Sequence, residues 1–525
     1  MLVHDYLIRS AERFPEKIAL VHGGRRTSYS ELLSAASSVS AWLRHAGVEK
    51  GDRVAILNDD PKEYISSYFG ILMAGGIVVA LNTDTSARTL GAQISGCGVS
   101  VAITQAKFMG HFRELGRGVT SLKSVAASGL KPSDAGDEGY ALFDLKDAFG
   151  FPPGAPAQSV RADIAQVIYT SGTTGGSSAV TLRHSNLVAN TASIIEYLKL
   201  GEDDSVMAVL PFFYSYGNSV MLTHIAAGGR LVANQNFIYP NIILGQMAAE
   251  EVTGFSGVPS TYAILLNRSA LRRYKFPALR YMTQAGGAMP PRLAREMKAM
   301  FPEVDFYIMY GQTEASARLS YLEPHELLRK AGSVGKAIPG VRLEVLDENG
   351  EPVGPGETGE IVASGENIMA GYWREPEKTA RVLRNGKLLT GDLARVDDEG
   401  FIYIVSRKSD IIKCGSHRIH PAEIEEALAE HAAVHESAVV GVEDEILGEA
   451  LKALVVLKTG YQCSRTELLQ HCKALLPSYK VPQHIDFIPE LPKTSSGKIK
   501  RALLKTPSAP GSPGLIDQRS QKEAG

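Results

Sequence analysis

Every residue from Thr170 to Ser178 is Thr, Ser or Gly, and this stretch directly follows the apolar run Val167–Tyr169. Its glycines allow positive φ and a close approach of the backbone to a ligand, while its hydroxyl and amide groups can donate to phosphate oxygens. A polar surface turn has a similar composition, but such a turn needs no strand-like run in front of it. The pattern therefore indicates a loop that wraps a polyphosphate.

This loop contains no lysine. Since no Lys occurs between Thr170 and Leu182, the stretch does not match G-x-x-x-x-G-K-[ST], in which the Lys reaches the outer phosphates. The departure argues against a P-loop NTPase.

Later positions carry groups that suit a nucleotide and its metal. Tyr310 ends a strand-like run and offers a flat face for a purine. Shortly after it, Thr313 offers a hydroxyl for a phosphate, and Glu314 offers a hard oxygen ligand for Mg²⁺. Asp392 has a carboxylate that can accept hydrogen bonds from both hydroxyls of a ribose.

Near the C-terminus, Lys498 lies in a second Ser/Gly-containing segment and has cationic neighbours at Lys493, Lys500 and Arg501. Runs of charge are usually solvated faces, and this is our interpretation of the three neighbours.

In this order, these segments resemble the signatures of the adenylate-forming superfamily, which includes acyl-CoA synthetases, peptide-synthetase adenylation domains and firefly luciferase. The matching segments, which are spread over nearly the whole chain, are Thr170–Ser178, Tyr310–Glu314, Ser364–Trp373 with Pro376, Thr390–Asp392 and Leu491–Arg501. The resemblance implies that ATP and a carboxylic acid form an acyl-AMP and pyrophosphate, and that a thiol then takes the acyl group.

The resemblance also implies roles for individual residues. Lys498 would bridge the carboxylate and the α-phosphate, and Glu314 would hold Mg²⁺ against the phosphates. The other implied nucleotide contacts are Thr170, Ser171, Gly172, Thr173, Thr174, Gly175 and Thr313 at the phosphates, Gly286, Gly287 and Tyr310 at the adenine, and Asp392 and Arg407 at the ribose. Gly311 is also an implied nucleotide contact.

The acid would bind beside the aromatic segment Leu210–Val220. Phe212 and Phe213 fit core packing equally well, but the hydroxyls of Tyr214 and Tyr216 favour a pocket lining. Amino-acid-activating relatives usually have an Asp in the segment matching 211–217, and no acidic residue occurs there. We therefore expect an acyl or aryl acid, with Tyr214, Tyr216, Ser256, Gly257, Gln284 and Ser316 as its neighbours.

One departure concerns the phosphate loop, which in the family usually continues with Pro-Lys-Gly where this chain has Ser177, Ser178 and Ala179. The missing cation predicts weaker binding of ATP rather than inactivity, because Lys498 and Glu314 are present. On this reasoning Ser178→Lys tightens ATP binding.

The second half-reaction would use a small C-terminal domain that swings about a hinge. The hinge position aligns with Ser409, and Lys413 and Gly415 would lie near the thiol, with Gly415 leaving room for a pantetheine arm. We expect CoA as the acceptor, with the phosphopantetheine of an acyl carrier protein as the alternative. The resemblance is also compatible with a non-catalytic nucleotide sensor or a luciferase-like oxygenase, although the four retained residues Glu314, Asp392, Arg407 and Lys498 favour an enzyme over a sensor.

Strands alternate with helices along most of the chain, which predicts an α/β fold with mostly parallel sheets. We expect a large N-terminal domain at 1–406, a small α+β domain at 407–505 and a disordered tail at 506–525, which is rich in Pro, Ser and Gly. The helix after Leu182 is expected to be capped by Ser185 or Asn186.

Composition narrows the class of partner. The chain has 525 residues and a formal net charge of -2, so no global field favours nucleic acid or an anionic membrane. The apolar stretch Tyr64–Leu81 contains Gly70, Gly75 and Gly76 and is interpreted as a buried helix and strand, without an integral membrane segment. The four cysteines of the chain do not have the spacing of a zinc site. They suggest free thiols in a reducing cytoplasm.

Overall fold

The computed structural model describes residues 1–131, 139–170, 178–415, 417–445, 447–493 and 499–505. These residues divide into two compact units, and the boundary along the chain lies between Ile404 and Val405. We describe each unit by itself.

The first unit contains a largely parallel sheet, sheet A, in the order β16-β15-β14-β13-β12-β10-β11-β1-β2. Parallel pairing runs from β14 to β1, and antiparallel strands close both edges. Its strands are β1 (Ile18–His22), β2 (Arg25–Ser28), β10 (Ser205–Ala208), β11 (Arg230–Ala233), β12 (Gly254–Gly257), β13 (Tyr281–Gln284), β14 (Asp305–Tyr310), β15 (Ser320–Leu322) and β16 (Lys336–Ala337).

A second sheet, sheet B, has the order β19-β9-β8-β4-β3-β5-β6-β7. Its strands from β8 to β7 pair in parallel, whereas β8, β9 and β19 pair antiparallel. Its strands are β3 (Arg53–Leu57), β4 (Ile77–Ala80), β5 (Val101–Gln105), β6 (Ser124–Ser128), β7 (Ala141–Asp144), β8 (Ile164–Thr170), β9 (Ser178–Arg183) and β19 (Gly371–Tyr372).

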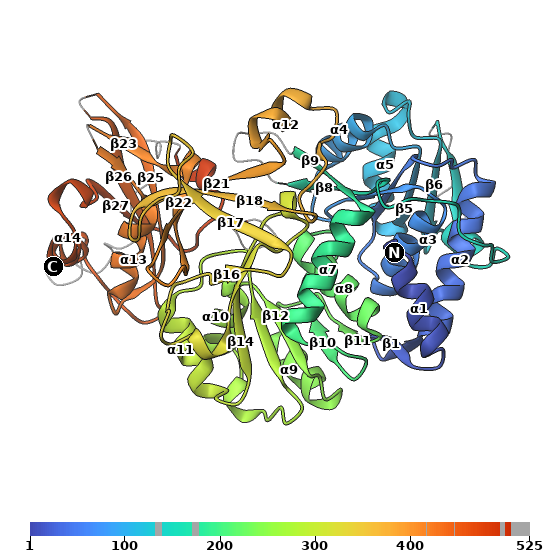
Figure 1. Cartoon of the computed structure of the whole chain (residues 1–525), viewed down its shortest axis with the longest axis horizontal. Coiled ribbons are helices and arrows are strands. Elements are labelled where there is room, and N and C mark those ends of the chain that lie inside the picture. Colours follow the sequence, from blue (N-terminus) through green and yellow to red (C-terminus); the bar gives the residue numbers. More distant parts are fainter. Residues whose placement is uncertain (132–138, 171–177, 416, 446, 494–498, 506–525) are drawn as a thin grey trace, which may run out of the picture. The chain divides into compact units, whose positions relative to one another are not determined.

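Helices fill the space between the two sheets and cover their outer faces (Figure 1). One core joins both sheets to α1 (Asp5–Arg13), α2 (Tyr29–His45), α3 (Pro61–Met73), α7 (His184–Leu198) and α8 (Ser215–Ala227). On its other face, sheet A packs against α9 (Pro240–Ala249), α10 (Pro259–Arg268) and α11 (Pro291–Met300). The outer face of sheet B is covered by α4 (Ala87–Cys97) and α5 (Met109–Leu115).

Local sequence explains several boundaries. The stretch Tyr64–Leu81 forms the buried helix α3 and the buried strand β4, as the sequence predicts. Helix α7 begins at His184, earlier than predicted. The backbone N–H of Arg183 donates to Asn186 Oδ1 at 2.8 Å, so Asn186 caps this end from inside the first turn.

A third, antiparallel sheet completes the first unit, in the order β17-β18-β21-β20, with β22 also paired to β21. Its strands are β17 (Val341–Leu346), β18 (Thr358–Gly365), β20 (Leu383–Arg384), β21 (Lys387–Val396) and β22 (Ile402–Arg407), the last of which crosses the boundary along the chain. The short helices α6 (Leu145–Phe149) and α12 (Pro376–Val382) also belong to this unit.

The second unit is a small α+β domain with the strand order β24-β23-β26-β25, and β27 pairs with β26. Its elements are β23 (Ile412–Cys414), β24 (His417–Ile419), α13 (Pro421–Glu430), β25 (Val434–Asp444), β26 (Gly448–Leu457), α14 (Arg465–Leu475), β27 (His484–Phe487) and α15 (Arg501–Leu504). The predicted α/β fold class is thus confirmed. Within the described ranges, no helix has both the length and the apolar character needed to cross a bilayer.

Candidate functional site

The predicted phosphate loop connects two paired strands of sheet B. Strand β8 ends at Thr170 and β9 begins at Ser178, and these two residues are register partners in the antiparallel pair. The Thr170 hydroxyl donates to the Ser178 carbonyl oxygen at 3.4 Å. The predicted contacts Ser171, Gly172, Thr173, Thr174 and Gly175 lie outside the described residues.

Strand β14 ends in a tight turn that delivers the next group of predicted residues. A Cβ atom on Gly311 would lie 2.0 Å from the carbonyl oxygen of Ala317, so only glycine fits at this position. Just before it, the Tyr310 hydroxyl donates to Asp392 Oδ2 at 2.7 Å. Asp392 lies on β21 and is buried. The structure therefore brings together one residue that the resemblance assigns to adenine, Tyr310, and one that it assigns to ribose, Asp392.

Thr313 and Glu314 follow this turn, in the single-turn helix Thr313–Ala315. The Thr313 and Ser215 hydroxyl oxygens lie 3.2 Å apart. Glu314 is half-buried, and its Oε1 accepts a hydrogen bond from the Tyr372 hydroxyl at 3.0 Å. Tyr372 belongs to β19, which pairs with β9 directly after the phosphate loop. Sequence reasoning did not single out Ser215 or Tyr372, although Tyr372 lies inside a matching segment.

The donor set at Glu314 fits Mg²⁺ only in combination with a bound nucleotide. Nowhere in the described part of the chain do three or more His, Cys, Asp or Glu side chains gather as a metal site. In nucleotide enzymes, Mg²⁺ is commonly held by one or two carboxylates and completes its shell with waters and substrate phosphates. A single half-buried carboxylate oriented by Tyr372 suits that mode.

A lysine contacts the position where the family's loop lysine is missing. Lys378 Nζ donates to Ser178 Oγ at 2.7 Å, although the two residues are 200 positions apart in the sequence. Lys378 lies on α12, has the Glu375 carboxylate at 3.0 Å, and has its Nζ 5.1 Å from the centre of the Tyr372 ring. Sequence reasoning missed this residue, because nothing in a linear pattern shows that α12 approaches the start of β9.

The predicted adenine-side glycines lie in the turn after β13. Gly286 has a φ of +87°, a conformation that glycine adopts without strain. Gln284 is fully buried at the end of β13, and its Nε2 donates to the Gly287 carbonyl oxygen at 2.8 Å. The Gln284 Oε1 atom has no hydrogen-bond partner among the described residues.

Residues predicted to line the acid pocket lie on several elements. Tyr216 is buried, and its hydroxyl contacts the Thr283 hydroxyl at 2.8 Å. The Ser256 hydroxyl accepts from Thr283 at 2.9 Å, and the Tyr214 hydroxyl accepts from Asn82 at 3.3 Å. Gly257 ends β12, and the Ser316 hydroxyl donates to the Asn367 carbonyl oxygen at 2.7 Å.

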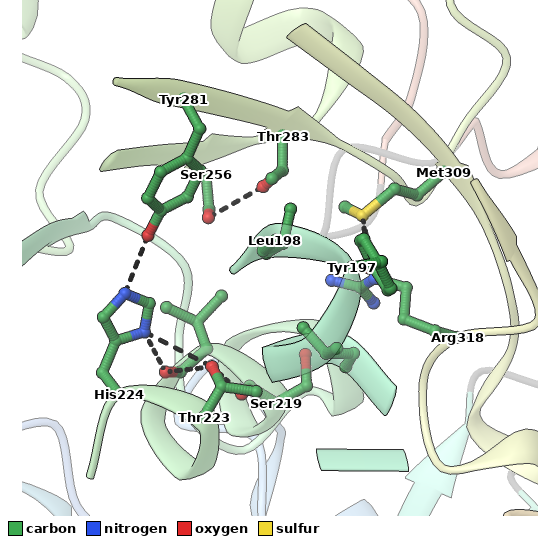
Figure 2. Close-up of a pocket in the computed structure, with 12 residues that line it drawn as sticks. Tyr197, Leu198, Ser219, Thr223, His224, Ser256, Tyr281, Thr283, Met309 and Arg318 are labelled. Atoms are coloured by element: carbon green, nitrogen blue, oxygen red, sulfur yellow. Dashed lines mark hydrogen bonds between the residues drawn. The ribbon is translucent and has the colours of Figure 1, made fainter. Parts of the chain in front are cut away.

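A small cavity of about 10 Å³ lies between α7, α8 and the strands of sheet A (Figure 2). Of the six predicted pocket residues, Ser256 lines it. His224 forms one wall and is hydrogen-bonded to the Val220 carbonyl oxygen and the Tyr281 hydroxyl, each at 2.8 Å. Burial lowers the pKa of His224 from 6.5 to about 4, which keeps the ring neutral near pH 7.

The remaining predicted residues belong to the second unit or lie outside the described residues. Arg407 ends β22, and Ser409 lies in the short helical turn Lys408–Asp410. The backbone N–H of Lys413 donates to Glu449 Oε2 at 2.7 Å, and Gly415 has a φ of +59°. Lys498 lies outside the described residues.

Comparison with known proteins gives consistent matches along the chain. The family profile of the AMP-binding enzyme matches residues 7–373, and that of the AMP-binding enzyme C-terminal domain matches residues 423–498. A long-chain-fatty-acid–CoA ligase of Bacillus subtilis (strain 168) is 35% identical, over 96% of this chain and 94% of the relative. A feruloyl-CoA synthase of an Amycolatopsis species is 34% identical, over 94% and 96%.

Solved structures agree with this match. ATP-bound MatB from Rhodopseudomonas palustris has a TM-score of 0.87 and 28% identity, and the alignment covers 96% of this chain and 98% of that one. O-succinylbenzoate coenzyme A synthetase (MenE) from Bacillus subtilis, in complex with ATP and magnesium ion, has a TM-score of 0.82 and 28% identity, with coverage of 95% and 99%.

Proposed function

Because this chain belongs to the AMP-binding enzyme family, we propose that it is an AMP-forming acid–thiol ligase that converts a carboxylic acid into its CoA thioester. The observation that carries the proposal is the pair of contacts at the end of β14. The Tyr310 hydroxyl donates to the Asp392 carboxylate, and the Glu314 carboxylate accepts from the Tyr372 hydroxyl. Tyr310 and Glu314 lie close together in the sequence. A nucleoside with a polyphosphate and its metal needs these groups close together.

The reaction has two steps. In the first, a carboxylate oxygen of the acid attacks the α-phosphorus of ATP, the bond to the bridging oxygen breaks, and pyrophosphate leaves with the electron pair. In the second, the thiol of CoA attacks the acyl carbon and loses its proton, and AMP leaves with the electrons of the acyl–oxygen bond. Two anions meet in the first step, so the site must neutralise charge at the phosphates.

We assign residues to these tasks as follows. Asp392 accepts the ribose hydroxyls, Tyr310 borders the adenine, and Thr170 and Thr313 donate to phosphate oxygens. Glu314 would hold Mg²⁺, and the ion would supply positive charge at the phosphates. The resemblance assigns Lys498 to the bond between the acid and the α-phosphate.

We further assign Lys378 to the outer phosphates. Its ammonium group meets Ser178, the residue that stands where the family has its loop lysine. A cation supplied by α12 would replace the one missing from the loop. With this assignment we no longer expect weak binding of ATP. The positive charge that the loop lacks is supplied by Lys378, from a different position in the sequence.

The second unit would carry Lys498 away after adenylation by a swing about Ser409, so that Lys413 and Gly415 face the thiol. For Lys498→Ala we expect adenylation to be lost while transfer of a supplied acyl-AMP to CoA continues. Single-turnover assays of each half-reaction measure this split. Equal loss of both steps would contradict the assigned role.

The test of the function itself is acid-dependent exchange of labelled pyrophosphate into ATP over a panel of acyl and aryl acids. Exchange that needs both an acid and Mg²⁺ supports the proposal, and no exchange with any acid refutes it. A single-turnover assay with free CoA or a purified acyl carrier protein then decides the acceptor. We expect CoA to react faster.

We place this reaction in the cytoplasm. The support is the set of free cysteines Cys97, Cys414, Cys463 and Cys472, three of which are buried. Thiols persist unpaired in a reducing compartment.

A further inference from the structure

Arg318 is a buried cation that lines the small cavity between α7, α8 and sheet A. The residue is 3% exposed and lies between β14 and β15. Its guanidinium carbon is 4.1 Å from the centre of the Tyr216 ring, a residue that the sequence places beside the acid. Figure 2 shows Arg318 beside Tyr197 and Met309, on the opposite side of the view from His224.

The contacts of the Arg318 guanidinium are with neutral groups, and the Tyr197 side chain is one of them. Its Nη1 donates to the Ala317 carbonyl oxygen at 3.3 Å, and its Nε donates to the Met309 sulfur at 3.4 Å. Among the residues that the structure describes, no carboxylate oxygen lies within 4.0 Å of the guanidinium. Arginine usually meets a carboxylate or phosphate through two parallel hydrogen bonds, and neither contact here is of that kind.

A buried charge without an anion is costly. Removing an ion from water costs several kcal/mol in real proteins, whereas a desolvated cation–π contact returns about 2 kcal/mol. The Tyr216 ring therefore offsets only part of the cost. Such an arrangement is typical of a site that acquires its anion from a ligand.

A ligand carboxylate needs more room than the cavity beside Arg318 offers, so the neighbouring side chains would have to repack to admit it. The cavity beside Arg318 holds about 10 Å³, which is room for a single water molecule. One group that now contacts the guanidinium is the thioether of Met309, a flexible unbranched side chain that repacks easily. A ligand carboxylate would take the place of this weak sulfur acceptor.

Arg318 also belongs to the same short segment of the chain as Thr313, a residue assigned to the phosphates. Thr313 contacts Ser215, and the next residue along α8 is Tyr216, the ring that Arg318 covers. Thr313 and Arg318 belong to one short segment, so their Cα atoms are at most about 18 Å apart.

We infer that the acid activated by this chain carries a second carboxylate at its far end, and that Arg318 binds it. The inference rests on the proposed function and specifies its substrate class. One carboxylate is adenylated, with release of pyrophosphate as above, and the other stays ionised against Arg318. Monocarboxylic acids of equal length leave the guanidinium without its partner and are rejected by about 100-fold or more in kcat/KM.

The experiment compares matched acids that differ in one group. Succinate, glutarate and adipate are assayed against butyrate, valerate and hexanoate by pyrophosphate exchange, with the wild type, Arg318→Met and Arg318→Lys. We expect the wild type to prefer the diacids, Arg318→Met to lose about 100-fold on diacids and to gain on monoacids, and Arg318→Lys to keep part of the preference. Arg230→Met is the control, because Arg230 pairs with Glu250 at the start of β11.

The outcomes separate the two claims. Wild-type exchange that is equal for diacids and monoacids overturns the inference and leaves the proposed function intact. So does an unchanged preference in Arg318→Met. If Arg318→Met does not fold, the wild-type preference and the Arg318→Lys variant decide. If no acid drives exchange, the proposed function fails, and calorimetry with the same diacids decides the inference. Binding that Arg318→Met or Arg318→Lys weakens supports it, and absent or unaltered binding overturns it.

Discussion

Removal of the Lys378 ammonium group tests how this chain compensates for its missing loop lysine. Lys378 Nζ donates to Ser178 Oγ at 2.7 Å, so the cation stands where β9 leaves the phosphate loop. If it binds the outer phosphates of ATP, Lys378→Ala weakens ATP binding. Because substrate and transition state lose the same contact, KM for ATP rises while kcat changes little.

The structure limits the size of this effect. Two unit charges 4 Å apart attract by about 1 kcal/mol in bulk water and by about 4 kcal/mol at the effective dielectric near a protein surface. The Lys378 side chain is 38% exposed, and the Glu375 carboxylate lies 3.0 Å from its Nζ, so the lower part of this range applies. A loss of about 1 to 2 kcal/mol corresponds to a rise in KM of about 5- to 30-fold.

A double-mutant cycle with Ser178 makes the assay specific. Steady-state kinetics at saturating acid and Mg²⁺ give KM for ATP in the wild type, Lys378→Ala, Ser178→Lys and the double variant. We expect Ser178→Lys to restore binding in the Lys378→Ala background and to add little in the wild type, because two adjacent ammonium groups repel. Lys107→Ala removes a half-exposed lysine paired with Asp59 and is the matched control, with KM unchanged.

The reasoning fails if Lys378→Ala has the wild-type KM for ATP while Ser178→Lys tightens binding on its own. That result would mean that the phosphate site lacks a cation, as the linear sequence alone suggests. A loss of kcat with no change in KM would also contradict it.

Two other predictions follow from the described contacts. Tyr372→Phe removes the hydroxyl that donates to Glu314. This change should raise the Mg²⁺ concentration for half-maximal activity by about 10-fold, as measured by metal titration. An unchanged Mg²⁺ requirement argues against a metal at Glu314. His224 has a folded pKa of about 4 and an ordinary value of 6.5, so below pH 6.5 the unfolded chain binds a proton that the folded one does not. The free energy of unfolding measured in urea should therefore fall by on the order of 3 kcal/mol between pH 6.5 and 4. In His224→Gln this fall should be smaller. An equal fall in both proteins would mean that another group is responsible.

Sequence reasoning succeeds where local pattern decides. The apolar stretch Tyr64–Leu81 contains its own glycine break, and this break is where α3 ends and β4 begins. The strand that ends at Tyr310 is likewise visible from its apolar run and from Gly311, which no other residue could replace. In both cases the determinants lie within a few residues of the feature.

Sequence reasoning fails where partners meet through the fold. Lys378 and Ser178 are joined because β19 pairs with β9, a register that no periodicity in either segment specifies. The sequence around Arg318 does not indicate that this arginine is buried, because it contacts Tyr197 of α7 and Tyr216 of α8, which lie far from it along the chain. The start of α7 differs from the prediction because Asn186 caps the helix from within its first turn.

The pairing of β19 with β9 makes the length of a short segment matter more than its composition. Strand pairing places Tyr372 opposite Val180, and Lys378 follows shortly afterwards in the first turn of α12, where it contacts Ser178. An insertion between them would leave the hydroxyl at Glu314 while carrying the ammonium group out of reach of Ser178. The number of residues between Tyr372 and Lys378 therefore determines where the ammonium group lies. Deletions or insertions in this segment should be tolerated far less than substitutions.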